Sequence, residues 1–187
     1  DNDGINDEND LYPNCFYNFY DECGICGGDG PQENYSCDDI PEKFNWNQSP
    51  NQGFYILEDA FIDDINIEPE DWIGAFFGDV CIGARKWNGP FTDIPVMGYN
   101  EQYQTTHNYI IAGEIPKFII YDYSEGEYYE THVDYDELTE DLVFDNVGIE
   151  FHNIVKIRVE RDCNGILGAP DGTSYLDICN VCSEGNT

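Results

Sequence analysis

The sequence predicts an all-β protein: an antiparallel β-sandwich of the immunoglobulin-like or jelly-roll kind, flanked by disulfide-rich, Asp-rich irregular linkers. Three observations support this fold class. Aromatic and β-branched runs separated by turn residues fill the centre, the 187-residue chain is 41% hydrophobic, and its eight cysteines gather toward the two ends. We therefore expect an Asp/Cys-rich linker (1–43), a β-sandwich domain (44–161) and a Cys-rich spacer (162–187).

The central region contains runs that are rich in residues favoured in strands. Gly78-Asp79 and the stretch 124–126 separate neighbouring runs and predict hairpin turns. The run 154–160 alternates charged with apolar residues, so one of its faces should pack against the core. A weak helical spacing makes 134–144 the one helix candidate. The expected strands are 53–62, 71–78, 80–87, 94–99, 116–123, 127–135 and 154–160.

Acidic residues dominate the charge, with 39 Asp and Glu against seven Lys and Arg and a formal net charge of −32. Nucleic acid and anionic lipid are excluded as expected partners because both would be repelled. Divalent cations are the natural partner, and a solvated acidic surface suited to salty water is the alternative explanation. No apolar run approaches the roughly 20 residues of a membrane span, and no signal peptide is present, so we expect a mature or excised piece.

The opening stretch "DNDGINDEND" places aspartates at alternating positions around Gly4. Aspartate side chains spaced in this way around a glycine turn can direct their oxygens at one hard cation. We therefore expect calcium as the cofactor, with Asp1, Asp3, Asp7 and Asp10 as its ligands. One more Asp two positions before Asp1 would improve the motif, which leads us to expect a segment of a longer or processed polypeptide.

The cysteines indicate covalently stapled modules at both ends of the chain. We expect local pairings among the four cysteines near the N-terminus, and a bond from Cys163 to Cys179 or Cys182. Disulfides imply an oxidising, extracellular setting, so the expected location is secreted, extracellular or at the cell surface. The cysteines of the first group are Cys15, Cys23, Cys26 and Cys37.

The cysteines also allow interpretations other than terminal disulfides. The C-x-x-C pairs Cys23/Cys26 and Cys179/Cys182 are able to form a four-thiolate zinc site, although they lie far apart in acidic, glycine-containing loops. A thioredoxin-type motif is less favoured, because no predicted strand precedes the first pair and no helix follows it. Cys81 lies alone in a strand, either as a buried free thiol or paired with a linker cysteine.

The two ends of the chain share a local pattern. The stretches "DECGIC" (21–26) and "DICNVC" (177–182) both read D-x-C-x-[IV]-C, and Cys179 follows Cys23 by 156 residues. Equivalent cysteine pairs therefore bracket the central region. This echo predicts a repeat unit that recurs in tandem or joins head to tail with copies of itself.

The stretch "DNDGINDENDLYPNC" resembles a thrombospondin type 3 repeat, whose pattern is Asp-x-Asp-Gly-[IV]-x-Asp-x-x-Asp followed by Cys-Pro or a variant. In that family, Asp side chains and nearby carbonyls wrap calcium ions and cysteines staple the loops. The resemblance implies that calcium is bound by four aspartates, Asp1, Asp3, Asp7 and Asp10. The chain departs from the pattern at 11–14, which intervenes before Cys15, and no second complete Asp repeat follows. A single calcium site is therefore implied rather than a series of ions.

The segment "DWIGAFFGDVCIGARKW" (71–87), with "PVMGY" and "FIIYDYSEGEYY" downstream, resembles a β-domain of very large secreted, multi-repeat bacterial surface proteins. Cys-rich spacers of the form "DCxG…CGVCGG" accompany such domains. Here the corresponding stretches are "DECGICGGDG" and "DCNGILGAPDGTSYLDICNVC". The resemblance implies an extracellular or surface polymer, and it brings no established activity or catalytic residues.

Catalytic patterns are missing from the sequence. The three histidines are scattered, no Ser or Cys occupies a nucleophile elbow, and carboxylate pairs carry no weight among 39 acids. We therefore expect no enzyme activity. Three Trp and fourteen Tyr provide the material for a sugar-stacking platform, but Trp72 and Trp87 lie in strand patterns and are expected in the core. Sequons at Asn34 and Asn47 permit N-glycosylation, which Pro50 disfavours at the second.

These observations predict an extracellular structural repeat, or a subunit of a surface filament or giant adhesin, rigidified by calcium and disulfides. Its expected partners are copies of itself, joined head to tail through the terminal linkers. The alternative is a carbohydrate-binding module of a secreted enzyme or adhesin, with polysaccharide as the partner. An exposed coplanar set of Trp and Tyr on one sheet face would favour this alternative.

Overall fold

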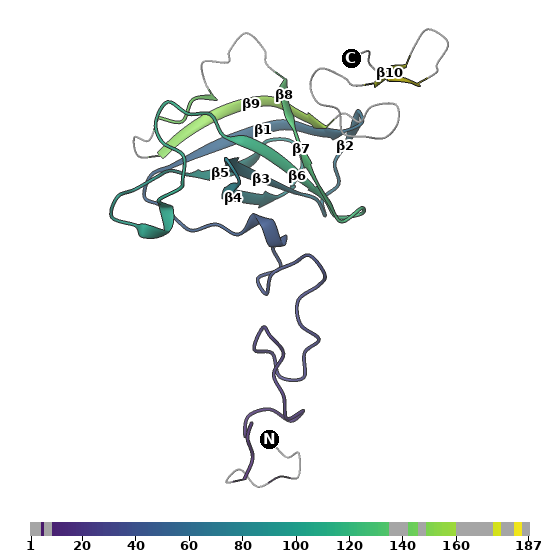
Figure 1. The fold of residues 1–187 in the computed structure, drawn as a ribbon, viewed down its shortest axis with the longest axis vertical. Helices are drawn as coiled ribbons and strands as arrows, with labels where there is room; N and C mark the ends of the chain where they lie inside the picture. The colour runs from purple at the N-terminus through teal and green to yellow at the C-terminus, as the bar shows by residue number, and fades with distance from the viewer. Residues whose placement is uncertain are drawn as a thin grey trace. The chain divides into compact units, whose positions relative to one another are not determined.

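The computed structural model of the protein describes residue 5 and residues 9–134, 142–145, 149–159, 174–176 and 182–184. The chain divides into two compact units, Asp1–Lys43 and Phe44–Thr187 (Figure 1). The first unit is built from turns and the isolated bridges Tyr20↔Cys26 and Tyr35↔Pro41. The 3-10 helix η1 (Glu42–Phe44) spans the division between the units.

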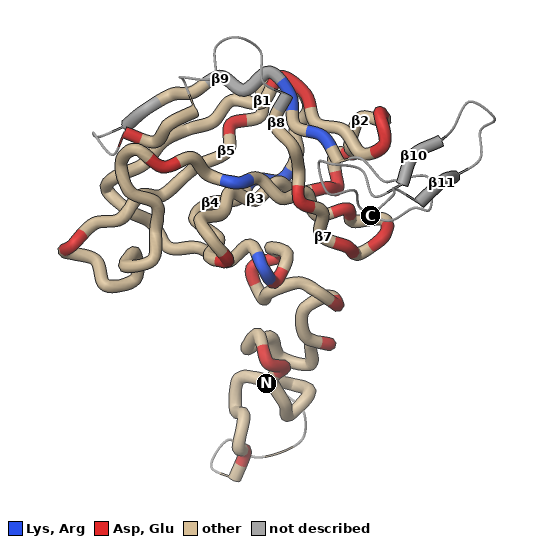
Figure 2. Tube along the Cα trace, turned by 45° about the horizontal axis from the view of Figure 1, so that its top comes forward, with Lys and Arg blue, Asp and Glu red and all other residues tan. Residues whose placement is uncertain are grey.

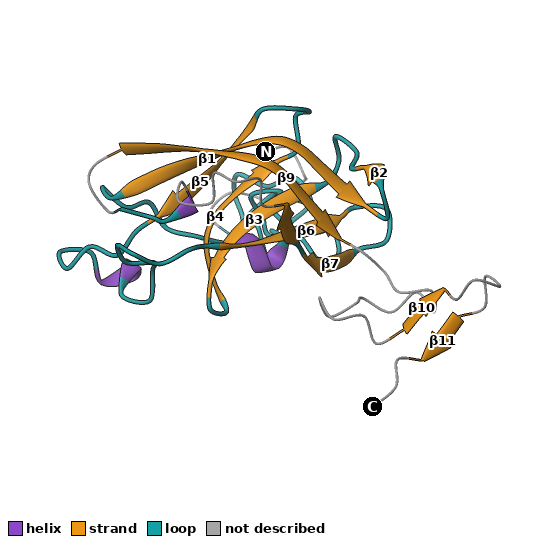
Figure 3. Ribbon diagram, turned by 90° about the horizontal axis from the view of Figure 1, so that it is seen from above, coloured by secondary structure: helices purple, strands orange, loops and turns teal. Residues whose placement is uncertain are grey.

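The second unit contains two large β-sheets, for which we call it the two-sheet unit, and a separate two-stranded sheet of β10 and β11 (Figure 3). One has the strand order β2-β1-β9-β8, with β5 also paired to β1, and the other has the order β4-β3-β6-β7. The all-β prediction is confirmed, since the described residues contain no α-helix and the named helices are the short 3-10 turns η1 and η2 (Gln104–Thr106). The strands are β1 (Gln52–Ile62), β2 (Ile65–Asn66), β3 (Trp72–Phe77), β4 (Val80–Lys86), β5 (Thr92–Met97), β6 (Lys117–Asp122), β7 (Glu127–Glu130), β8 (His132–Asp134), β9 (Ile149–Val159), β10 (Ser174–Leu176) and β11 (Cys182–Glu184).

Short turns connect the strands where the sequence places turn residues. Gly78 has a φ of 58° in the hairpin between β3 and β4, a conformation that glycine adopts without steric cost. Asp63 and Asp64 join β1 to β2 with φ values of 50° and 63°. Aspartate tolerates this left-handed region better than most residues, and two consecutive positive φ values suit a tight hairpin.

The two sheets share one hydrophobic core. Tyr55 of β1 lies in it with no exposure, 5.6 Å from the ring of Phe118 in β6, and its hydroxyl donates to the carbonyl of Leu142 at 3.0 Å. The sheets therefore face each other across apolar side chains supplied by both. The fully buried members include Tyr55, Leu57, Ile73, Ile82, Ile94, Val96, Ile120 and Ile157.

The ladder between β1 and β9 is parallel, and it pairs Gln52 with Ile149 and Ile62 with Val159. The prediction of a purely antiparallel sandwich is wrong for this ladder, while the other strand pairs are antiparallel. Parallel neighbours need a long crossover, and the chain between β1 and β9, which includes the whole second sheet, provides it.

The predicted strand 127–135 is divided between the sheets. Its first part, β7, pairs with β6, whereas β8 pairs with β9 in the opposite sheet. Thr131 lies at the crossing, where its backbone N–H and its hydroxyl both donate to the carbonyl of Phe118, at 3.1 and 2.9 Å. The helix candidate 134–144 falls mostly outside the described residues. No helix in the described part of the chain has the length and apolar character of a membrane span.

A second aromatic cluster packs on the outer side of the β4-β3-β6-β7 sheet. Phe44 has no exposure, and its ring lies 5.8 Å from that of Phe76 and 5.4 Å from that of Tyr128. Gly74 lies beneath it, and a Cβ at Gly74 would come within 2.7 Å of the Phe44 ring. Neighbouring strand residues point to opposite faces, so Ile73 enters the main core while Gly74 accommodates Phe44.

Candidate functional site: a disulfide-bonded acidic module

Two disulfides staple the N-terminal unit. Cys15 bonds to Cys26 and Cys23 bonds to Cys37, so the two closed loops overlap between Cys23 and Cys26. The predicted local pairing of these four cysteines is confirmed. Because Cys23 and Cys26 each bond to a cysteine outside their C-x-x-C pair, neither offers a thiolate to zinc, and they do not form a redox disulfide with each other. Covalent closure substitutes here for a core that so short a segment cannot build.

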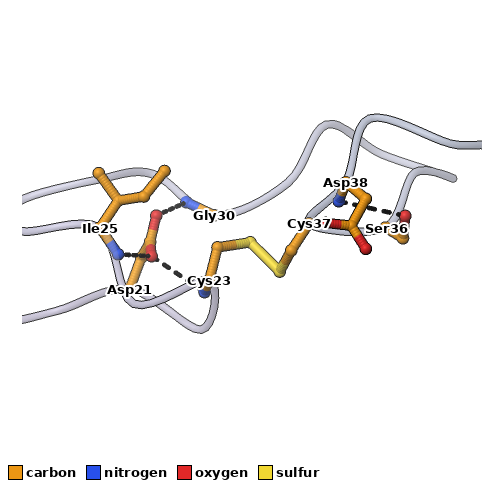
Figure 4. The surroundings of a disulfide bond; sticks show 7 residues. All are labelled: Asp21, Cys23, Ile25, Gly30, Ser36, Cys37 and Asp38. Atoms are coloured by element: carbon orange, nitrogen blue, oxygen red, sulfur yellow. Dashed lines mark hydrogen bonds between the residues drawn. A yellow bond between two sulfur atoms is a disulfide. The ribbon is translucent and has the colours of Figure 1, made fainter.

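Asp21 organises the loop between the bridges (Figure 4). One carboxylate oxygen accepts hydrogen bonds from the backbone N–H groups of Cys23 at 2.9 Å and Ile25 at 2.8 Å, and the other accepts from Gly30 at 3.0 Å. The bond from Ile25 is the largest cause of a lowered pKa of Asp21, because it favours the ionised form. The sequence pattern did not predict this role of Asp21 in the loop, although Asp21 is the first residue of the D-x-C-x-[IV]-C echo.

Asp10 is the one predicted calcium ligand among the described residues. Its Oδ1 accepts a hydrogen bond from the Tyr12 N–H at 2.7 Å. Its Oδ2 is buried, with no hydrogen-bond partner in the described part of the chain. A buried carboxylate oxygen without a donor is costly, and a cation would satisfy it. Asp1, Asp3 and Asp7 lie outside the described residues, within which no three His, Cys, Asp or Glu side chains are grouped to hold a metal.

The N-terminal unit (Asp1–Lys43), which we call the module, exposes large apolar side chains. Exposure among them ranges from 42% for Tyr20 to 81% for Leu11. Two edge-to-face contacts order part of this set, between Phe16 and Tyr17 and between Tyr12 and Tyr20, with ring centroids 5.5 and 5.6 Å apart. These exposed apolar side chains all lie within a short stretch of the chain, residues 11–25. We call Leu11, Phe16, Tyr17, Phe19, Tyr20 and Ile25 the exposed apolar set.

An acid-lined cleft of about 230 Å³ lies beside β2 in the second unit. Asp71 lines it, is 4% exposed, and accepts hydrogen bonds from the backbone N–H groups of Glu68 at 2.7 Å and Tyr123 at 2.9 Å. Burial is the main cause of the raised pKa of Asp71, with the charges of Asp122 and Glu68 adding to it. Asp71 therefore ties two loops together, as Asp21 does in the module.

The other four cysteines are Cys81 in β4 and three residues near the C-terminus, Cys163, Cys179 and Cys182. Cys81 is a buried free cysteine whose S–H donates to the carbonyl of Gly83 at 3.4 Å. Burial raises the pKa of its thiol to about 12, so the reactive thiolate is scarce at neutral pH. Cys163 and Cys179 lie outside the described residues, and the predicted bond from Cys163 to Cys179 or Cys182 stays a prediction.

The tryptophans do not form an exposed platform. Trp87 is 5% exposed within the core, and Trp46 and Trp72 are half-buried. The exposed Tyr103 and Tyr123 of the second unit lie in a loop and a turn rather than along a sheet face. In the described residues, therefore, no coplanar set of Trp and Tyr supports the carbohydrate-binding alternative.

Both predicted glycosylation positions are exposed, and their sequons differ in the state of the serine. Asn34 lies in a turn with a φ of 66°, and Ser36 is half-buried. The backbone N–H of Asn47 donates a hydrogen bond to the hydroxyl of Tyr109 at 2.6 Å. Ser49 is buried, and its hydroxyl donates to the carbonyl of Gly98 at 2.7 Å. Modification at either asparagine stays a prediction.

Negative charge is distributed over both units, with few basic residues among it (Figure 2). Arg85 forms an ion pair with Asp93 at 2.7 Å, and Arg158 lies 3.8 Å from Asp64. Even if every Lys and Arg paired once, 32 of the 39 carboxylates would have no basic partner. Neutralisation of this surface therefore depends on cations from the solvent.

The fold and the module define an all-β protein whose acidic N-terminal unit is closed by two disulfides, bonds that are typical of oxidising environments. Comparisons of the chain with protein-family models, with curated proteins and with solved structures found no match.

Proposed function

We propose that the chain is an extracellular structural repeat, or a subunit of a surface filament or giant adhesin, in which calcium and disulfides stiffen the N-terminal module. Copies join head to tail through the terminal linkers. In this proposal the two-sheet unit is a sandwich of the immunoglobulin-like or jelly-roll kind that spaces successive linkers. The exposed apolar set is the observation that carries the proposal, because it leaves apolar surface on a segment that a neighbouring copy would cover.

Cysteine parity supports a covalent contribution to assembly. The four module cysteines are paired and Cys81 is buried and free, which leaves three in the remainder of the chain. Three thiols cannot all pair with one another, so at least one of Cys163, Cys179 and Cys182 has a partner in a neighbouring unit if all are oxidised. If the neighbouring unit is a separate chain, oligomers on a non-reducing gel that collapse to monomers with reductant are the expected result.

Calcium is proposed at the beginning of the module, supported by the unpartnered buried Oδ2 of Asp10. A ligand that binds only the folded state adds about 2.7 kcal/mol of stability at a hundredfold excess over its Kd. We expect calcium to slow amide hydrogen exchange in the module and Asp10→Asn to weaken this effect. Asp29→Asn is the matched control, since Asp29 is an exposed acid of the same module. An equal effect of both substitutions, or no response to calcium, would contradict the site.

Assembly is tested by electron microscopy and sedimentation of the full chain in calcium. We expect linear chains of units that shorten when Phe16→Ser removes a member of the exposed apolar set. Phe91→Ser is the matched control, because it removes a similarly exposed phenylalanine, 68% against 57%, from the second unit. Monomers in calcium, or contacts made only through the two-sheet unit, would contradict head-to-tail assembly.

A further inference from the structure

The parallel β1–β9 ladder joins the strand at which the chain enters the two-sheet unit to the strand at which it leaves. Residues 44–51 lead into Gln52 at the start of β1, and the chain continues beyond Val159 at the end of β9. Because the strands are parallel and aligned, Gln52 lies beside Ile149 and Val159 lies beside Ile62. The entry and exit points are therefore at opposite ends of one ladder.

This geometry determines how tension acts on the unit. A pull on the two flanking segments draws β1 backward and β9 forward along the same axis, so the load runs parallel to the strands. The inter-strand hydrogen bonds then carry the load together and must fail together. In an antiparallel pair joined in the same way, both ends would leave from one side and the bonds would open one at a time.

We propose that the β1–β9 ladder is a shear clamp that lets the two-sheet unit bear tension along the chain. The proposal rests on the proposed function, since a tandem array or filament loads each unit through its two ends. The clamp extends over almost the whole length of both strands, from Gln52↔Ile149 to Ile62↔Val159. β5 pairs with β1 along its other side, from Gln52↔Met97 to Leu57↔Thr92, and adds a second ladder that β1 must leave.

The segment 44–51 lies in series with the clamp and is held by individual contacts rather than by a strand ladder. Asn51 accepts a hydrogen bond from the Gly98 N–H at 2.7 Å and donates its side-chain amide to the carbonyl of Tyr99 at 2.8 Å. Ser49 donates to the carbonyl of Gly98, and Phe44 packs on the outer sheet face. These contacts release in sequence, so the segment should detach in a small early step before the clamp takes the load.

Single-molecule force spectroscopy of the full chain, with handles fused to both termini, tests the clamp. We expect one main event at high force with a contour-length gain of roughly 350–390 Å for residues 52–159, less the folded end-to-end distance. In a second geometry, the C-terminal handle is replaced by one attached at Asp79, in the β3–β4 turn. No described ladder joins β1 to β3 or β4, so we expect the high-force event to be lost. An equal force in both geometries would overturn the clamp.

A matched pair of variants separates the clamp from general stability. Ile157→Val and Ile120→Val each remove one methyl group from a fully buried isoleucine, the first in β9 and the second in β6. Both should lower equilibrium stability. Under end-to-end load, Ile157→Val should raise the unfolding rate about 2- to 12-fold, while Ile120→Val leaves it near the wild-type rate. Equal rates for the two variants would overturn the proposal.

The outcome does not depend on assembly, because a single chain is pulled. High end-to-end resistance in a chain that stays monomeric in calcium would refute the proposed function and leave the clamp standing. Low resistance in a chain that forms linear assemblies would refute the clamp and leave the proposed function standing.

Discussion

Asp21 and Asp71 hold loops in the same way in two different surroundings. Each carboxylate accepts backbone hydrogen bonds, three at Asp21 and two at Asp71, yet the pKa of Asp21 is lowered and that of Asp71 is raised. The difference follows from burial, since Asp71 is 4% exposed in a unit with a core. Where water remains, backbone donors stabilise the charge, and where water is excluded, desolvation outweighs them.

The same contrast applies to the units that contain these residues. The module holds its turns with two covalent bridges and one half-buried carboxylate, whereas the second unit holds two sheets with a shared apolar core. The module should therefore be sensitive to redox conditions and acid. The second unit should be sensitive to changes of volume and spacing in its interior.

The largest expected effect is the loss of a bridge from the module. Replacing both members of one bond, as Cys15→Ala with Cys26→Ala, should cost about 2–5 kcal/mol of module stability and leave the two-sheet unit folded. Hydrogen exchange and limited proteolysis should show opening confined to the module. Cys81→Ala is the control, because its thiol is free and lies in the second unit. Unchanged protection of the module amides would show that the bridges are not what orders it.

An intermediate effect is expected from adding a methyl group where the sheets approach closely. A Cβ at Gly83 would overlap the backbone carbonyl oxygen of Pro95 in β5, which the β1 ladder holds in place. Gly83→Ala should therefore cost about 1–3 kcal/mol, measured as a shift of the urea midpoint. Gly74→Ala is the comparison, since its Cβ would come within 2.7 Å of the buried ring of Phe44, which is a side chain rather than backbone held in a ladder. A larger loss at Gly74 would contradict this assignment.

The smallest effect is a pair of opposite pH responses. Because the folded pKa of Asp21 is below its ordinary value of 3.8, its stabilisation is present above 3.8 and is lost as pH falls through the folded pKa. The folded pKa of Asp71 is above 3.8, so its contribution to stability increases as pH falls through that pKa toward 3.8. Carboxyl-carbon NMR titration should show the two shifts with opposite sign. Shifts of the same sign would remove the contrast between the units.

Strand positions were predictable where the pattern is local. The runs at 53–62, 71–78 and 80–87 correspond to β1, β3 and β4 within one or two residues. The pairing of strands in the sheets was not predictable, because the composition of a strand does not determine which strand it pairs with. The parallel β1–β9 ladder and the division of 127–135 between two sheets both depend on distant residues. β9 begins at Ile149, earlier than the predicted strand 154–160, because polar residues in its first half hide the strand pattern.

The module shows a similar division between local and distant information. Cysteine spacing predicted bonds among four residues, but four cysteines allow three pairings, and the spacing does not choose the observed one. Asp21 was within reach of sequence reasoning, because an aspartate two residues before a cysteine in a glycine-rich loop is a turn-forming residue. The exposure of the exposed apolar set was not predictable from the sequence, because apolar residues beside cysteines usually predict burial.

The β1–β9 ladder also fixes the order in which the chain can finish folding. Every pair in it joins residues roughly a hundred positions apart, so its formation requires a large loop to close and raises the contact order of the whole unit. During synthesis at about 5–20 residues per second, β1 waits about 5 to 20 seconds before β9 emerges. Throughout that interval, the side of β1 that β9 will cover is an open edge available to other nascent chains. A chain that stops before Ile149 keeps that edge permanently, and its fate is aggregation rather than a slightly smaller domain.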